Sequence, residues 1–136
     1  MPEENKELLM RYRLEQAHEC LNAAMLLINA ASFKDATNRS YYCLFHAMRA
    51  LLAMEGFDSK KHSGIIAAFR QKYIKSGIFP VEFSDIINGA FEARGSSDYE
   101  DFFVISKEDV VHLFENAKEF LAAVEAYLKS LSKNSQ

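Results

Sequence analysis

One arginine and one histidine have the residue types and the spacing of a catalytic pair on a single predicted helix. Arg39 and His46 lie seven residues apart in the segment 38–52, which reads NRSYYCLFHAMRALL. An α-helix turns by about 100° per residue, so seven steps return to within roughly 20° of the starting direction. We therefore expect the guanidinium and the imidazole to share one stripe of the helix, with Tyr42 between them.

Such a pair is suited to the cleavage of RNA. A histidine with a pKa near neutrality can take the proton of a 2′-hydroxyl group or donate one to the leaving oxygen. An arginine can stabilise the charge of the transition state through two parallel hydrogen bonds. One histidine is a small set for two proton transfers, so a symmetric dimer would supply a second. The structural alternative is that His46 is a buried, hydrogen-bonded core histidine and that Arg39 pairs with an acid such as Asp98.

The helix that carries the pair has two different faces. Large apolar residues gather on one side, and small residues accompany Arg39 and His46 on the other. The apolar side comprises Tyr41, Leu44, Phe45, Met48, Leu51 and Leu52, and the small side comprises Ala36, Cys43, Ala50 and Ala53. A helix of this kind is expected to be packed on both sides. The small side also leaves room for the close approach of a second copy.

The apolar spacing predicts an all-α protein with a single domain. Five helices are expected over residues 5–30, 33–55, 61–75, 81–93 and 107–131. Ser32 and Ser106 are suited to cap helix starts, and Gly56 and Gly77 to end helices. No segment alternates as a strand does. Joined by short links and a loop over residues 95–101, these helices make an antiparallel bundle over about residues 5–131, followed by a short disordered tail.

The composition narrows the class of protein. The chain has 136 residues, of which 49% are hydrophobic and 26% charged, and a net charge of −3 that does not suggest a general binder of polyanions. It has neither a signal-peptide start nor an apolar run of the roughly 18 residues that cross a bilayer, so we expect a cytoplasmic protein. Cys20 and Cys43 lack metal or redox spacing and are expected to be small buried hydrophobes. No cofactor and no metal are expected.

Charge is unevenly distributed along the chain. The third predicted helix carries five cations and no acid between residues 59 and 75, whereas acids dominate residues 82–109. The five cations are Lys60, Lys61, Arg70, Lys72 and Lys75. One interpretation is two solvated surfaces of opposite sign. The other is a phosphate-attracting patch beside Arg39 and His46.

Several further side chains are candidate contacts for a phosphate or a substrate. Tyr42 lies within the Arg39–His46 stripe, although bundle packing is the alternative for it. Lys61 and His62 stand at the start of the third predicted helix, where an anion is favourably placed. Three more candidates share the predicted loop after the fourth helix, and an ion pair that orders this loop is their alternative role. They are Arg94, Asp98 and Tyr99.

Three motifs occur in the order found in a known family. The segment 38–52, the segment 61–64 (KHSG) with Phe69 after it, and the segment 94–99 (RGSSDY) resemble landmarks of small bacterial and archaeal HEPN-domain proteins. The resemblance covers about residues 5–130. It implies an up-and-down four-helix bundle with an additional short helix, usually as a homodimer. Many members of that family are metal-independent endoribonucleases that act as toxins beside a minimal nucleotidyltransferase antitoxin.

The resemblance leaves competing hypotheses. The family hallmark is an Arg followed, after four to six residues, by a His, and Arg39 and His46 meet it with six between them. This favours an endoribonuclease toxin. A non-catalytic module that binds a partner protein or a nucleotide is favoured by the acidic total charge and by Ser40, where active members commonly have Asn, Asp or His. Met48 replaces the Tyr of the subgroup that is silenced by adenylylation. A purely structural dimer is the third hypothesis.

Overall fold

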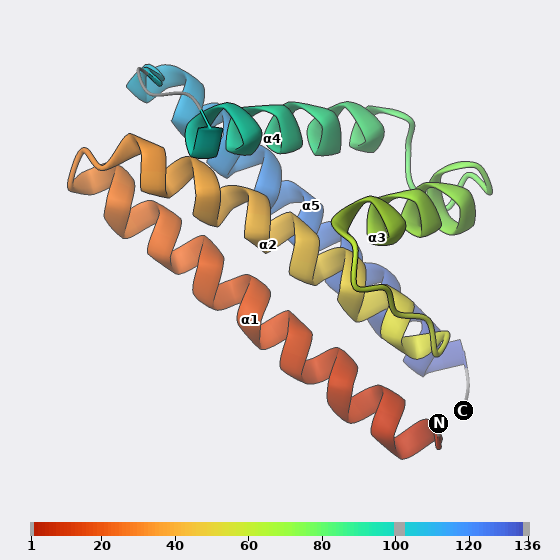
Figure 1. Cartoon of the computed structure of the whole chain (residues 1–136). Helices are drawn as coiled ribbons and strands as arrows, with labels where there is room; N and C mark the ends of the chain where they lie inside the picture. Colours follow the sequence, from red (N-terminus) through yellow and green to blue (C-terminus); the bar gives the residue numbers. More distant parts are fainter. Residues whose placement is uncertain (1, 100–102, 135–136) are drawn as a thin grey trace.

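The structure, a computed structural model of the chain, describes residues 2–99 and 103–134, and it is all-α over these ranges (Figure 1). The elements are α1 (Glu3–Asn29), α2 (Phe33–Met54), α3 (His62–Phe69), a π-helical turn η1 (Arg70–Ile74), α4 (Glu82–Tyr99) and α5 (Lys107–Asn134). No strand occurs in these ranges, so the predicted all-α fold is confirmed. None of the described helices is both long and apolar enough to cross a membrane.

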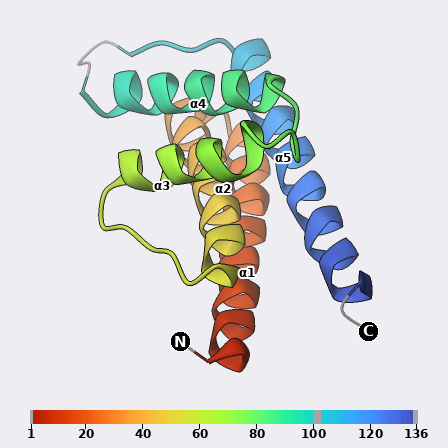
Figure 2. The same cartoon turned by 90° about the vertical axis from the view of Figure 1, so that its right-hand side faces the viewer.

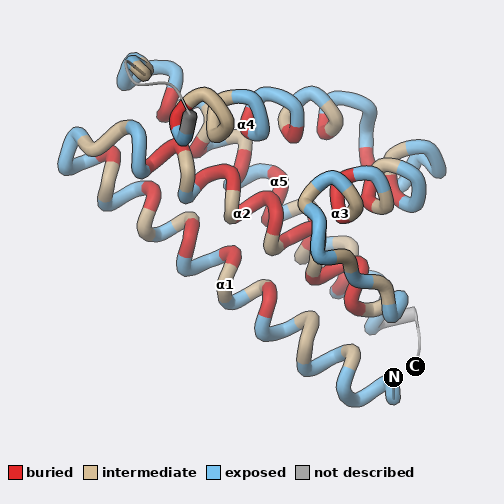
Figure 3. The backbone as a smooth tube through the Cα atoms, in the orientation of Figure 1, coloured by how far each residue is buried: buried red, intermediate tan, exposed pale blue. Residues whose placement is uncertain are grey.

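Helix α2 is the centre of the molecule. It packs against α1, α3, α4 and α5, and α1 runs antiparallel beside it (Figure 1). The turned view shows α3 and α4 lying across α2, whereas α1 and α5 follow its length more closely (Figure 2). Buried residues accordingly occur on most sides of α2, including the small residues Ala36, Cys43 and Ala50, whereas the stripe that carries Arg39 and His46 is exposed or half-buried (Figure 3). The prediction that this helix is packed on both sides is confirmed.

Aromatic side chains fill much of the core between α3, α4 and α5. Phe79, in the link after the π-helical turn, stacks on Phe69 of α3 and on Phe83 of α4. Phe83 in turn stacks on Phe120 of α5, with ring centroids 5.0 Å apart. Each of these rings is almost completely buried. Burial of one such side chain is worth about 1.5–3 kcal/mol, so this stack fixes the short helices against the long ones.

Most predicted helix ends are observed. Gly56 and Gly77 have φ angles of +71° and +81°, which glycine adopts at little cost, and each follows the end of a helical segment. The hydroxyl of Ser106 accepts a hydrogen bond from the backbone N–H of Asp109, as a helix cap does. Ser32 precedes α2 as predicted, but its hydroxyl donates to the carboxylate of Asp35 instead of capping the backbone.

Three boundaries differ from the prediction. The loop predicted over residues 95–101 is helical as far as Tyr99, because tertiary contacts outweigh the cost of about 1 kcal/mol of a glycine within a helix. The third helix ends at Phe69 and continues as the π-helical turn, which leaves Tyr73 buried in the core. The tail predicted after residue 131 is helical to Asn134. The side chain of Tyr99 and residues 100–102 lie outside the described part.

Candidate functional site

Arg39 and His46 line one surface pocket. The pocket has a volume of about 340 Å³, and its other lining residues are Cys20 from α1 and Asn38 and Tyr42 from α2. Arg39 lies two turns before His46 on α2, so the two side chains reach the same opening. We call this the α1–α2 pocket. The structure therefore brings the two predicted catalytic side chains together, with Tyr42 beside them.

The guanidinium of Arg39 is available to a ligand. Arg39 is exposed, and within the described ranges it makes no ion pair with an acid. Its near neighbour is the thiol of Cys20, whose pKa is raised by burial in spite of a hydrogen bond from Arg39. Asp98 instead pairs with Arg94, with Nε and Oδ2 3.1 Å apart. The alternative in which Arg39 pairs with Asp98 is therefore wrong.

His46 is a neutral imidazole at the wall of the pocket. Burial, together with the nearby guanidinium groups of Arg49 and Arg13 and the ring of His62, lowers its pKa from 6.5 to about 4. Its Nδ1 atom is buried and has no hydrogen-bond partner in the described part of the chain. His46 is thus not the satisfied core histidine of the structural alternative. At neutral pH the ring is uncharged, and because Nδ1 is buried, it can take a proton from a group in the pocket only through Nε2.

Arg94 and its partner Asp98 are connected to the pocket by a contact between Arg94 and Tyr42. Arg94 donates a hydrogen bond of 3.2 Å to the hydroxyl of Tyr42, and its guanidinium lies over the rings of Tyr41 and Tyr42. Its ion pair with Asp98 spans one turn of α4, so the pair predicted for a loop is found on a helix. Because Tyr42 accepts from Arg94, its own O–H is left to donate toward the pocket.

His62, the first residue of α3, packs against Tyr41 and Tyr42. Its Nδ1 is 2.8 Å from the hydroxyl of Tyr41, and its ring stacks on Phe45 with centroids 4.1 Å apart. Burial raises the pKa of Tyr41 to about 12, so the phenol keeps its proton. The tautomer of His62 decides which of the two groups donates in this hydrogen bond. Burial, followed by Arg94 and Arg49, lowers the pKa of His62.

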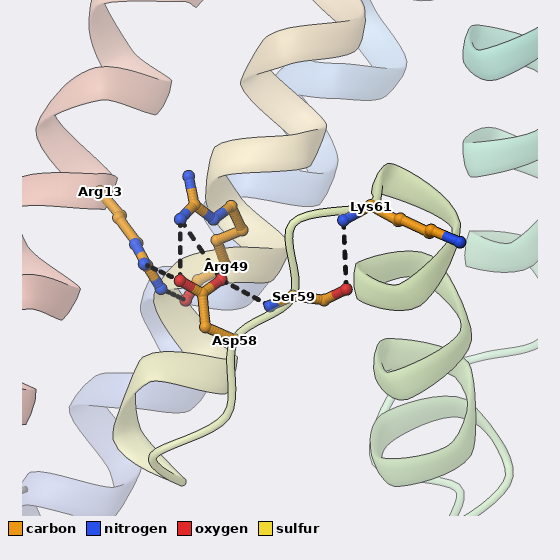
Figure 4. A network of polar contacts seen from close by, with 5 residues as sticks. All are labelled: Arg13, Arg49, Asp58, Ser59 and Lys61. Carbon is orange, nitrogen blue, oxygen red and sulfur yellow. Dashed lines mark hydrogen bonds and ion pairs between the residues drawn. The ribbon is translucent and has the colours of Figure 1, made fainter.

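Two arginines and one aspartate form a network (Figure 4), in which Arg49 stands three residues after His46 on α2. Asp58, in the link between α2 and α3, accepts hydrogen bonds from Arg13 of α1 and Arg49 of α2, each at 3.2 Å. Arg13 also donates to the backbone carbonyl of Arg49 at 3.0 Å. Partial burial raises the pKa of Asp58, but the Ser59 N–H and the two guanidinium groups outweigh this, and the net pKa is lowered. We call Arg13, Arg49 and Asp58 the arginine–aspartate network.

Sequence reasoning missed this network. Arg13 is 4% exposed and stands four residues before the buried Ala17, on the core-facing side of α1. The position of a cation on an apolar stripe could therefore have indicated that Arg13 has a buried partner. Asp58 lies 45 residues away in a connector, and nothing in its local sequence indicates the partner. The contribution of the network is a net positive charge close to His46.

The basic segment is partly engaged in contacts of its own. Lys72 pairs with Glu55 at 2.8 Å, and Arg70 donates to the side-chain carbonyl of Asn88. Lys60 and Lys61 are exposed, and the side chain of Lys61 extends away from the arginine–aspartate network in Figure 4. Among the described residues no group of three His, Cys, Asp or Glu side chains is placed to hold a metal ion.

Comparison with known proteins identifies the family. The model of the HEPN domain matches residues 10–127. A "UPF0332 protein" of Thermotoga maritima is 35% identical over 128 residues, which cover 94% of this chain and 97% of the relative. "Putative toxin MJ0142" of Methanocaldococcus jannaschii is 34% identical over 121 residues, which cover 89% of this chain and 81% of the relative. The chain therefore belongs to the HEPN domain family.

Proposed function

We propose that this protein is a metal-independent endoribonuclease of the toxin type, with His46 and Arg39 as its catalytic residues. The observation that carries the proposal is the α1–α2 pocket, where an exposed guanidinium with no acidic partner among the described residues shares the opening with a neutral imidazole. Relatives named as toxins support the biological class. The proposed role is the cleavage of cellular RNA, held in check by a nucleotidyltransferase-type antitoxin.

The reaction uses the 2′-hydroxyl group of the RNA itself. His46 takes the proton of this hydroxyl, and the oxygen attacks the adjacent phosphorus. A bond forms between O2′ and phosphorus, and the bond between phosphorus and O5′ breaks, which leaves a 2′,3′-cyclic phosphate and a 5′-hydroxyl. The Arg39 fork donates to the non-bridging oxygens as their charge grows. Tyr42 contributes a further hydrogen bond to the same phosphate.

The proton for the leaving oxygen requires a second group. A pKa of about 4 leaves His46 unprotonated at neutral pH, so one copy of the ring serves as the base and not as the acid. In the proposed homodimer, the charged His46 of the first protomer passes the proton that it took from the 2′-hydroxyl to the neutral His46 of the second protomer, which donates its own N–H proton to O5′, so the number of protons is unchanged. Lys61, His62 and Arg94 would contact phosphates on either side of the cut.

Two measurements test the proposal. Expression of the wild-type protein should slow the growth of a bacterial host, and His46→Ala should relieve this effect. The purified protein should cut single-stranded RNA in the presence of EDTA and leave a 2′,3′-cyclic phosphate. His112→Ala is a matched control, because His112 is exposed on α5 and bonds only to Asn116 in the described structure. Cleavage that survives both His46→Ala and Arg39→Ala, or that EDTA abolishes, would overturn the assignment.

One observation favours the second candidate function, a non-catalytic module that binds a partner protein or a nucleotide. Ser40, which follows Arg39, is fully buried, and its hydroxyl has no partner among the described residues. It therefore cannot reach the α1–α2 pocket to assist Arg39. Inert purified protein that forms a tight complex with its antitoxin would support this second function.

A further inference from the structure

A second pocket lies between α3, the π-helical turn and α4. It has a volume of about 230 Å³, and its lining residues are Ser63, Ile66, Ala67, Arg70, Ile87, Asn88 and Phe91. Ile66 and Ile87 are buried and form an apolar floor. Phe91 is 41% exposed, so part of its ring is open to a ligand. We call this the α3–α4 pocket.

The charged and amide groups of this pocket offer hydrogen-bond donors. Arg70 donates to Asn88, and because arginine has no acceptor, the contacted atom of Asn88 is its carbonyl oxygen. The NH₂ group of Asn88 therefore remains free to donate. The Nε–H of Arg70 is buried and has no partner in the described part of the chain. No carboxylate is among the described residues that line the pocket, so a ligand that suits it presents hydrogen-bond acceptors at its edge.

The π-helical turn places these donors. It begins at Arg70, where the helix widens after Phe69. Such turns are rare and occur frequently at functional sites, because the additional residue re-aims a side chain. Here the side chains of Phe69 and Tyr73 remain in the core while the Arg70 side chain meets α4. The sequence around Arg70 contains no acid from residue 59 to 75, which suits a polyanionic ligand.

A continuous series of aromatic rings joins the two pockets. The ring of Phe91 packs edge-on against Tyr41, with centroids 6.0 Å apart. Tyr41 packs against Tyr42 at 5.2 Å, and Tyr42 lines the α1–α2 pocket together with His46. His62, a proposed phosphate contact, directly precedes Ser63 of the α3–α4 pocket. Tyr41 is completely buried, so the half-exposed side chain of His62, which also packs edge-on against Tyr42, is the link between the two pockets at the surface.

We propose that the α3–α4 pocket binds one unpaired base of the single-stranded RNA, next to the phosphate that is cut. This inference rests on the proposed function, since it takes RNA as the substrate. Proteins read single-stranded RNA by stacking bases on aromatic rings and by hydrogen bonds to the base edges. The base lies against Phe91, and its edge faces Arg70 and Asn88. Guanine is preferred over adenine, because its O6 and N7 both accept hydrogen bonds whereas the N6 group of adenine donates.

Binding of uncleavable RNA tests this directly. The probes are 2′-O-methyl uridine octamers that carry one guanosine, one adenosine or one abasic site, and their affinity is measured by fluorescence anisotropy at fixed salt. The guanosine probe should bind about 5- to 150-fold more tightly than the abasic probe, the range expected for one stacked base. The affinity for the adenosine probe should lie between the affinities for the other two probes. Equal affinities for all three probes would overturn the proposal.

Two variants connect the preference to the pocket. Asn88→Asp keeps the oxygen that Arg70 contacts, but it replaces the amide donor with a negative charge, so the fold is retained and the guanosine preference should disappear. Asn116→Asp on α5 adds the same charge elsewhere and should leave the preference intact. Phe91→Ala should lower the affinity for the guanosine and adenosine probes but not for the abasic probe. Tyr12→Ala removes an exposed ring on α1 and should leave the affinity for all three probes unchanged. A guanosine preference that survives Asn88→Asp would refute the assignment.

The same samples separate this inference from the proposed function. If unmodified RNA is cut but neither variant changes the base preference, the pocket assignment fails and the nuclease stands. If the guanosine probe binds through Asn88 while unmodified RNA stays intact, the nuclease fails and the base pocket stands. Free GMP that binds as tightly as the octamer would show that the pocket serves a nucleotide and not RNA, which would overturn the proposal.

Discussion

The α1–α2 pocket and the arginine–aspartate network lie on neighbouring turns of α2, but their arginines differ in whether the guanidinium is paired with a carboxylate. In the network, Arg13 and Arg49 share the carboxylate of Asp58, and Arg13 is almost completely buried. In the pocket, Arg39 is exposed and has no acidic partner in the described ranges. A guanidinium that is already paired holds elements together, whereas an unpaired one can receive an anion. The network therefore has a structural role, whereas the α1–α2 pocket is the region for which we propose catalysis.

The two regions are nevertheless coupled. Two guanidinium groups share one carboxylate, so the network keeps an excess positive charge near His46. After burial, Arg49 and Arg13 are the next causes of the low pKa of this ring. The structural region therefore helps to keep the proposed catalytic base unprotonated at neutral pH. The two regions therefore differ in their contacts, but the positive charge of the network still lowers the pKa of His46 in the pocket.

The largest expected effect is on the rate of RNA cleavage. His46→Ala should lower kcat by about 10²- to 10⁴-fold, because a positioned general base typically contributes this much. Its thermal unfolding midpoint should fall only slightly, since the substitution removes ring contacts with Tyr42 and Phe45 but no hydrogen bond of Nδ1 within the described part of the chain. Single-turnover cleavage and thermal unfolding measure the two quantities. A large loss of stability with an unchanged cleavage rate would mean that His46 has a structural role and not a catalytic one.

The next effect is on stability and belongs to the network. Asp58→Ala leaves two guanidinium groups, one of them buried, without their carboxylate. Because Asp58 is 53% exposed, we expect a loss of about 2 kcal/mol, below the value for a fully buried pair. Urea unfolding measures it. Glu7→Ala breaks the exposed pair with Arg11 and should cost no more than about 1 kcal/mol, so equal losses in the two variants would contradict the structural role of the network.

A smaller effect distinguishes charge from geometry in the pocket. Arg39→Lys keeps the positive charge but not the fork that binds two phosphate oxygens, and we expect cleavage to slow by about 10-fold. Arg11→Lys is the matched control, since Arg11 lies on the exposed face of α1 and pairs with Glu7. An unchanged rate for Arg39→Lys would mean that Arg39 supplies attraction alone and not the directed contacts of a catalytic group.

The predictable part of the fold is the part that depends on local periodicity. The apolar spacing of α2 and the glycines at 56 and 77 predict helix positions because helix faces and left-handed ends are local properties. The end of α4 was not predictable in this way. Gly95, Ser96 and Ser97 are typical of a turn, but Ser97 is buried in the folded chain and the Arg94–Asp98 pair bridges the same turn. Tertiary packing decides that segment.

The candidate site shows the same limit. Helical geometry alone is sufficient to place Arg39 and His46 on one face, because they belong to one helix. The contacts of Tyr42 with Arg94 and of Tyr41 with His62 join segments that are 52 and 21 residues apart. The pKa of His46 depends on Arg13, which comes from another helix. These features arise from the packing of helices, which no spacing within one segment reveals.

The smallest effect tests the coupling between the two regions through the pH dependence of stability. The pKa of His46 is about 4 in the folded protein and near 6.5 in the unfolded chain, so the unfolded chain binds more protons between these values. The free energy of unfolding should therefore be level above pH 6.5 and should fall as the pH decreases toward 4. Because the ring is open to the pocket on one side, we expect a loss of about 1 kcal/mol between pH 7 and pH 5.

His46→Gln isolates this contribution. His62, whose pKa is also lowered, adds a loss of the same sign in both proteins. Asp58 acts in a different range, because its lowered pKa lies below 3.8, and the stability that it contributes is lost only under more acidic conditions. The difference between wild type and His46→Gln from pH 7 to pH 5, measured by urea unfolding, is therefore due to His46. Equal pH dependences would mean that burial and the network do not disfavour the charged ring, and the coupling would have to be abandoned.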